Sequence, residues 1–273
     1  MDSLAALRLQ IEWGADEALD NEPRDHFRPT SQPLFHPTLQ PPAAPAQSAL
    51  PPSATATPTR AATATPTRAP TPVAARGQAV AAAAATLAEL YAALDAFDGC
   101  ALRATATATV RPDGNPAARL LLIAEAPGAD DDRTGIAFAG PAGQTLDRML
   151  RSVELDRTGL LMTHLVPWRP PGGRAPTEAE IQVCLPFLLR LLHLVRPDRL
   201  ILLGSAPVRA LTGNSDSIRR LRGRWLEATL PGFDAPIPAL PMLPCDQWLR
   251  SAAAKRDSWA DLLALRNSLN PNP

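Results

Sequence analysis

The amino-acid sequence predicts an α/β domain with a doubly wound, mostly parallel sheet. Short apolar runs alternate with helical patterns of ten or more residues, and this alternation is typical of parallel sheets covered by helices. The runs expected to form strands lie at 119–125, 159–166, 199–204 and 236–243. The patterns expected to form helices lie at 78–97, 142–153, 177–195, 205–211 and 252–269, the last being clearest over 252–265.

The strand predictions depend on apolar runs that end at turn-forming residues. The run 119–125 (RLLLIAE) leads into Ala-Pro-Gly, and 159–166 (GLLMTHLV) is closed by Pro167. The run 199–204 (RLILLG) ends in glycine. Runs that are apolar on both faces are typical of buried parallel strands.

The helix predictions depend on spacing and capping. Leu87, Leu90, Leu94 and Phe97 recur at helical intervals in an alanine-rich stretch, which indicates a helix packed on the core. Thr177 followed three residues later by Glu180 forms a capping box at the start of a long helix.

The first quarter of the chain has a different composition. Of 31 prolines, many lie between residues 28 and 73, in a stretch made mostly of Pro, Ala, Thr, Ser and Gln. The octad ATATPTRA at 54–61 is repeated at 62–69. Such a stretch buries too little apolar surface to offset its conformational entropy. We therefore expect a short helical segment at 1–27, a disordered linker at 28–76 and a folded domain at 77–273. The segment 1–27 either docks on a protein partner or is a frayed helix with no role.

Charge and hydropathy argue against a strongly basic nucleic-acid binder, a membrane-spanning protein and a secreted protein. The 27 basic and 27 acidic residues balance, so the chain lacks the overall basic excess of many nucleic-acid binders. Four arginines cluster in RRLRGR at 219–224, either as a solvated helix edge or as a patch that contacts phosphates. No apolar run is long enough to span a membrane and no signal peptide is present, so we expect a cytoplasmic protein.

The fold class itself indicates where a ligand would bind. In doubly wound sheets, ligands bind beyond the carboxyl ends of the strands. Here these ends carry Glu125-Ala-Pro-Gly128, His164–Arg169, Gly204-Ser205 and the segment 243–246.

Five segments in order carry a resemblance to a known family. They are AEAPGADDDRTGIAFAGPAGQTLDRML (124–150), PWRPPGGRAPTEAEI (167–181), LLGSAP (202–207), IRRLRGRW (218–225) and LR-x4-KRDSWADLL (249–263). Together they resemble the type-4 branch of the uracil-DNA glycosylase superfamily, over about residues 94–265. The resemblance implies a three-layer α/β/α fold with a four-stranded, mostly parallel sheet. It also implies an enzyme that flips uracil out of DNA and cleaves its N-glycosidic bond.

The resemblance assigns roles to residues of this chain. Glu125 would orient the attacking water or stabilise the cationic sugar, and Phe138 would stack on the base. Further contacts to the base are expected from Ala126, Gly128 and Thr163. The resemblance implies contacts to DNA phosphates for Arg169, Arg222 and Arg250. The acidic residues Asp130–Asp132 are expected to be a solvated loop beside the site.

The chain departs from the family at the four ligands of an iron–sulfur cluster. Members with a four-iron four-sulfur cluster hold it with four cysteines, and the corresponding positions here are Phe97, Cys100, Trp168 and Cys184. Such a cluster needs four ligands, usually cysteines. We therefore expect no cofactor and no metal, with Cys100 and Cys184 as ordinary buried thiols.

Two further departures affect the expected active site. The family has Thr-Asn where this chain has Thr163-His164, so His164 would read the base edge, charge to stabilise an anionic base, or only line the cleft. The late family motif supplies a histidine that donates to the departing base. That position falls on Pro244, or on Leu243 with one insertion, and neither can donate. His164, Asp246 and Gln247 are the candidates to compensate.

Two functions follow from these observations. The first is a DNA repair glycosylase that hydrolyses the bond to uracil or another deaminated base, with Glu125 and His164 as catalytic residues. The second is a catalytically impaired protein on the same fold that binds DNA or a protein partner. Under both, we expect a monomer that binds DNA and not a membrane.

Overall fold

The computed structural model describes residues 71–269, and in that range it confirms the predicted α/β class. One sheet has the strand order β1-β3-β2-β4-β6-β5. Its four inner strands are parallel and correspond to the four expected strands: β2 (Leu120–Ala124), β3 (Leu161–His164), β4 (Arg199–Leu203) and β6 (Ile237–Met242). The segments 1–27 and 28–70, expected to be helical and disordered, lie outside the described residues.

Two short edge strands enlarge the expected four-stranded sheet. β1 (Asp113–Gly114) pairs antiparallel with β3, and β5 (Leu226–Ala228) pairs antiparallel with β6. Segments of two and three residues are too short to show an alternating pattern, so the sequence did not reveal them.

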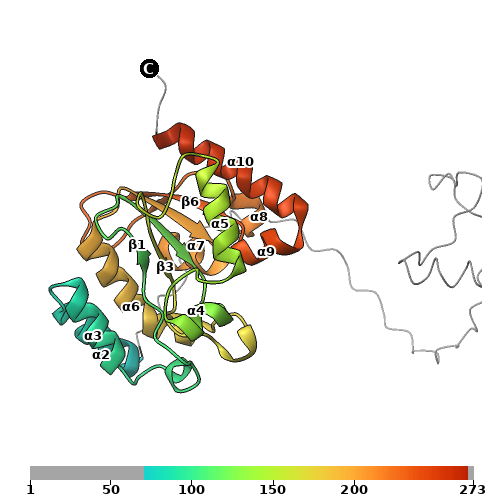
Figure 1. The fold of residues 1–273 in the computed structure, drawn as a ribbon. Helices are drawn as coiled ribbons and strands as arrows, with labels where there is room; N and C mark the ends of the chain where they lie inside the picture. The colour runs from blue at the N-terminus through green and yellow to red at the C-terminus, as the bar shows by residue number, and fades with distance from the viewer. Residues whose placement is uncertain (1–70, 270–273) are drawn as a thin grey trace, which may run out of the picture. The chain divides into compact units, whose positions relative to one another are not determined.

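Helices cover both faces of the sheet and produce three layers (Figure 1). One face carries α2 (Pro72–Ala83), α3 (Leu87–Ala96), α6 (Glu178–Val195) and α7 (Ser205–Thr212). The other carries α5 (Pro141–Arg151), α9 (Cys245–Arg250) and α10 (Ala252–Leu269). The short helices are α4 (Ala129–Thr134) and α8 (Ile218–Leu221), and two 3-10 turns span Ala101–Ala104 and Pro171–Gly173. Among residues 71–269, no helix combines the length and apolar character needed to cross a membrane.

The inner strands divide their side chains between the two helical layers. In β2, Leu121 and Ile123 pack toward α6, whereas Leu120 and Leu122 pack toward α5 and α10. All four are buried, as expected for a parallel strand covered on both faces. Because of this alternation, neighbouring residues at the end of a strand also face opposite layers.

The helix expected at 78–97 is two helices, so that prediction was wrong in detail. α2 begins at Pro72 and ends at Ala83, and α3 begins after Thr86. Thr86 caps α3, since its Oγ1 accepts from the backbone N–H of Glu89 at 3.2 Å. The expected domain boundary at 77 therefore falls inside α2. The capping box of Thr177 and Glu180 at α6 is confirmed.

Candidate active site

A cavity of about 500 Å³ lies at the carboxyl ends of the four inner strands. Its walls come from the loop after β2, the end of β3, the Pro-Pro-Gly-Gly loop, the end of β4 and the start of α9. Strand pairing aligns Ala124 of β2 with His164 on one side and Leu203 on the other. The cavity is therefore where the topology of the sheet predicts a ligand.

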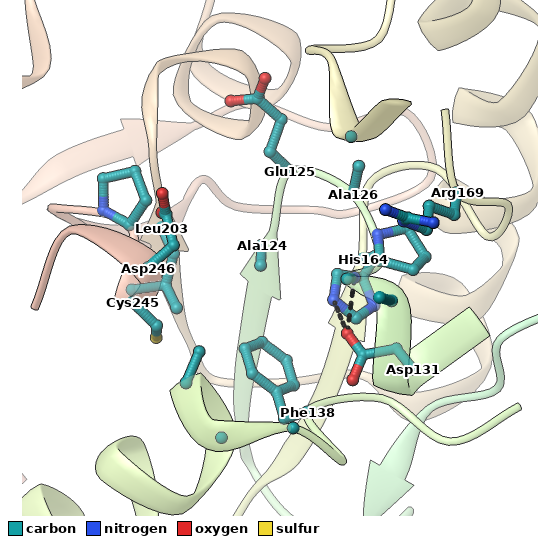
Figure 2. Close-up of a pocket in the computed structure, with 18 of the residues that line it drawn as sticks. Ala124, Glu125, Ala126, Asp131, Phe138, His164, Arg169, Leu203, Cys245 and Asp246 are labelled. Carbon is teal, nitrogen blue, oxygen red and sulfur yellow. Dashed lines mark hydrogen bonds and ion pairs between the residues drawn. The ribbon is translucent and has the colours of Figure 1, made fainter. Parts of the chain in front are cut away.

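Glu125 follows the last residue of β2 and lines the cavity. Its side chain points away from Phe138 and His164 (Figure 2). Burial raises the pKa of Glu125, while the backbone N–H of Ala206 and the charge of Arg209 act in the opposite direction. Both stabilising groups belong to α7, so the carboxylate lies near the start of that helix, where an anion is favoured.

His164 ends β3 and is buried, with 7% of its surface exposed. Its ring is stacked against Phe138 with centroids 5.0 Å apart and 14° between the planes. Nε2 lies 3.5 Å from Oδ2 of Asp131. Burial lowers the pKa of His164 to about 4, although the Asp131 charge acts to raise it. The imidazole is therefore neutral at pH 7.

Asp131 was missed by the sequence analysis, and the expectation that Asp130–Asp132 is a solvated loop was wrong for Asp131 and Asp132. Asp131 and Asp132 are 6% and 7% exposed. Asp131 accepts from the backbone N–H of Gly128 at 2.9 Å and of Ala139 at 2.8 Å. Asp132 accepts from the backbone N–H of Thr107 at 2.9 Å. The signal in the sequence is an Asp three residues after Gly128, the spacing of a helix-capping acid.

Phe138 is held in an unusual backbone conformation at the wall of the cavity. Its φ is +58°, a left-handed value that is costly for a bulky residue. Arg157 donates from Nη2 to the Phe138 carbonyl at 2.9 Å. Gly143 lets α5 approach the same carbonyl, because a Cβ there would overlap the oxygen. The fold thus fixes the aromatic ring at one position, and Arg157 is a second residue that sequence reasoning missed.

Most of the predicted site residues line the cavity, and two do not. Those that do are Glu125, Ala126, Gly128, Phe138, His164, Arg169 and Arg250. Thr163 is absent from the lining because it precedes His164 in β3 and faces the opposite layer, beside Leu188 and Leu191. Arg222 is also absent, since its guanidinium binds Asp261 of α10 at 2.8 Å.

The segment after β6 offers no histidine to the cavity. Leu243 is completely buried in the core, and Pro244 lines the cavity as the N-cap of α9. Beyond it, Asp246 is exposed and pairs with Arg250 at 3.3 Å, while Gln247 is partly buried in the wall. Hydrocarbon side chains therefore occupy both positions where the family resemblance implies a donor.

The two cysteines of the incomplete ligand set lie together in the core. The Sγ atoms of Cys100 and Cys184 are 3.8 Å apart. Phe97 and Trp168 are 2% and 1% exposed and pack in the same apolar cluster. Trp168 also donates from Nε1 to Oγ1 of Thr109 at 3.2 Å. Indole and phenyl rings cannot ligate iron, so these four residues do not fit a four-cysteine cluster.

Comparison with known proteins gives consistent matches. The family model described as "Uracil DNA glycosylase superfamily" matches residues 111–263, more than half of the chain. A type-4 uracil-DNA glycosylase from Archaeoglobus fulgidus is 35% identical over 132 residues, which are 47% of this chain and 66% of that protein. Similar proteins come from Pyrobaculum aerophilum (33% over 125 residues; 46% and 64%) and Thermotoga maritima (34% over 140 residues; 49% and 73%). The match thus spans just under two thirds of the first two relatives.

Proposed function

Because the chain belongs to the uracil-DNA glycosylase superfamily, we propose that it hydrolyses the N-glycosidic bond of uracil, or another deaminated base, flipped out of DNA. The observation that carries the proposal is the cavity at the strand ends, which combines a carboxylate, a neutral imidazole and a fixed aromatic ring. The reaction consumes one water and leaves a free base and an abasic site.

Phe138 and His164 would receive the flipped base. A base that leaves the DNA stack needs an aromatic surface and a polar contact to its edge. Phe138 provides the surface, and its fixed backbone means that little ordering is needed on binding. The carboxylate of Asp131 faces Nε2 of His164, which favours a proton on Nε2 and a lone pair on Nδ1. Nδ1 would then accept from an N–H group of the base edge.

Glu125 would act on the sugar side of the bond. Its carboxylate extends away from Phe138 and His164 (Figure 2), so a base held by those rings leaves the sugar closer to Glu125. There it would orient the attacking water and stabilise the positive charge that develops on the sugar. Because the pKa of Glu125 is raised, its carboxylate takes up a proton and loses its negative charge at a higher pH than an ordinary glutamate does.

Uracil-containing DNA is the proposed partner, with Arg250 at the cavity rim as a contact to the phosphate backbone. The side chain of Arg250 is 79% exposed, so it can reach a phosphate outside the cavity. Arg222 is a less suitable contact because Asp261 already neutralises its charge.

We also infer that the domain contains no iron–sulfur cluster and that side-chain packing occupies its position. Anaerobically purified protein should then contain no more iron than the Cys100→Ser/Cys184→Ser double variant. About four iron atoms per chain, lost in the double variant, would contradict this inference.

The proposed reaction is tested by a cleavage assay on a labelled oligonucleotide that contains one uracil. Full-length protein should produce alkali-sensitive strand breaks, and Glu125→Gln should reduce their rate by roughly 100-fold or more while DNA binding is retained. Phe138→Ala is expected to weaken binding of uracil DNA more than of undamaged DNA. Glu227→Gln is the matched control, because Glu227 is an exposed glutamate on the edge strand β5 and does not line the cavity.

The absence of a histidine at Leu243 and Pro244 favours a specific alternative, a DNA-binding protein with an inactive cavity. Tight binding of uracil DNA without breaks on uracil, hypoxanthine or xanthine would support that alternative and exclude the glycosylase.

A further inference from the structure

Arg169 is a cation in the cavity wall whose charge forms no ion pair with any residue in the range 71–269. It follows the buried Trp168 and extends toward the middle of the cavity (Figure 2). Its Nε is buried and donates to no acceptor among the described residues. Within the same part of the chain, no carboxylate lies within ion-pair distance of its guanidinium. A buried polar group without a partner costs free energy and usually has a functional reason.

The other arginines of the cavity are paired. Arg174 binds Glu180 at 2.6 Å, and Arg250 binds Asp246 at 3.3 Å. Arg169 is less accessible than these two rim residues, and an arginine remains protonated at any pH that the fold tolerates. It therefore gives the cavity wall a permanent positive charge that forms no ion pair within residues 71–269.

The loop around Arg169 fixes the backbone from which the guanidinium extends. Trp168 and Pro170 on either side are buried, which fixes the backbone at the base of the side chain. The next turn contains Gly172 and Gly173 with φ of +67° and +70°. A Cβ on Gly173 would lie 3.7 Å from Nη2 of Arg169, so this turn passes directly beside the charge. A cation that extends from a fixed backbone into the cavity and has no ion-pair partner among the described residues is available to an anion that develops in a transition state.

The proposed reaction creates such an anion. When the glycosidic bond breaks, its electron pair moves to N1 of the base and spreads onto the neighbouring carbonyl oxygens. Water adds to the sugar carbon and releases a proton, and the base anion later takes up a proton. Neither the neutral His164, whose Nε2 faces Asp131, nor Pro244 can neutralise this charge.

We propose that Arg169 binds the departing base and stabilises its negative charge. This assignment rests on the proposed glycosylase function. It goes beyond that function because it gives each of three charged residues of the cavity a different part of the substrate. Glu125 acts on the cationic sugar, Arg169 on the anionic base and the exposed Arg250 on DNA phosphate.

The test varies the leaving base and the arginine together. Single-turnover cleavage is measured on oligonucleotides that contain uracil or 5-fluorouracil, with full-length wild type, Arg169→Gln, Arg169→Lys and Arg250→Gln. The fluorine withdraws electrons, so the 5-fluorouracil anion needs less stabilisation by the protein.

Arg169→Gln should slow cleavage of uracil by roughly 100-fold and of 5-fluorouracil by much less. Arg169→Lys keeps the charge and should recover part of the rate. Arg250→Gln should weaken DNA binding. It should slow cleavage of the uracil and the 5-fluorouracil oligonucleotides by the same factor.

Three outcomes would overturn the assignment. An equal loss on both bases in Arg169→Gln, together with weaker DNA binding, would identify Arg169 as a phosphate contact. An unchanged rate in Arg169→Gln would exclude any role. A wild type that binds the uracil oligonucleotide but releases neither base would disprove the proposed function itself, and the role of Arg169 with it. Thermal melting confirms that each variant is folded. If Arg169→Gln does not fold, Arg169→Lys should still slow cleavage of uracil more than cleavage of 5-fluorouracil, by a smaller factor.

Discussion

The carboxylate of Asp131 connects three parts of the cavity wall. It accepts from Gly128 of the first loop and from Ala139 beside Phe138, and it faces Nε2 of His164. The aromatic ring, the imidazole and the first loop therefore share one anchor. Glu125, Phe138 and His164 could be named from the sequence because each follows a recognisable strand or motif. Asp131 could not, because its role depends on contacts across the chain that a run of three aspartates does not reveal.

Burial of neutral His164 should make stability depend on pH. Its pKa is about 4 in the folded protein against 6.5 for an ordinary histidine, so the unfolded chain binds more protons between these values. The stabilisation is complete above pH 6.5 and is lost as the pH falls toward 4. Thermal melts of wild type and His164→Gln at pH 7 and pH 5 measure this. The melting temperature of wild type should fall more between pH 7 and pH 5 than that of His164→Gln. An equal fall in both proteins would contradict the burial of a neutral His164.

Gly143 should be intolerant of even one added methyl group. A Cβ at this position would overlap the carbonyl oxygen of Phe138, which Arg157 also binds. Gly143→Ala should therefore destabilise the protein by about 1–3 kcal/mol and slow uracil cleavage, since the Phe138 ring must shift.

Gly159→Ala is the matched control for that substitution. A Cβ on Gly159 would lie 3.6 Å from the carbonyl oxygen of Asp156, an ordinary contact. Chemical denaturation should show a change within about 0.5 kcal/mol for the control. Similar stability of both variants would mean that the approach of α5 to Phe138 is not close.

An ion pair joins the elements α8 and α10, and it is formed by an arginine for which the family resemblance implies a contact to DNA. Arg222 follows α8 and binds Asp261, whose side chain is only 4% exposed. Gly223 permits this contact, since a Cβ there would lie 2.5 Å from Oδ1 of Asp261. Burial raises the pKa of Asp261 to about 6 even though Arg222 acts to lower it.

Removing Arg222 should leave Asp261 buried without a partner. Arg222→Met is expected to destabilise the protein by about 3 kcal/mol in urea denaturation with little change in affinity for DNA. Arg220→Met is the control, because Arg220 is 73% exposed and its contact with Asp216 is 3.8 Å long. A large loss of DNA affinity in Arg222→Met at unchanged stability would restore the DNA-contact interpretation.

Elements with a local sequence signal were predictable, and elements without one were not. β2, β3, β4, β6 and α6 each contain an apolar run or a capping signal that identifies them locally. The break between α2 and α3 was missed because alanine continues through it and only Thr86 marks the new helix. α4 and α9 have six residues each, so a helical period barely repeats within them.

At the scale of the whole molecule, the core includes a helix that starts inside the stretch expected to be a linker. α2 starts at Pro72, inside the Pro- and Ala-rich stretch, and packs on α6. Ala81 and Ala84 are 1% and 4% exposed, and Arg190 donates to the Ala84 carbonyl at 2.7 Å. Alanine has too little apolar surface to mark this helix as part of a core, which explains why the expected boundary at 77 lies inside α2.

Truncation tests where the folded domain begins. A chain that starts at residue 71 should melt at the same temperature as the full-length protein. A chain that starts at residue 86 lacks α2 and exposes part of α6, so it should melt at a lower temperature. Equal melting of the two truncated chains would show that α2 contributes nothing to the core.

Release of the free base is the most direct measure of the proposed chemistry. Full-length protein is incubated with DNA that contains one uracil, and small molecules and DNA are analysed by mass spectrometry. We expect one free uracil for each abasic site formed, with neither product in Glu125→Gln. Intact uracil DNA recovered in complex with the wild-type protein, with no free base, would show that this fold binds the lesion without cleaving it.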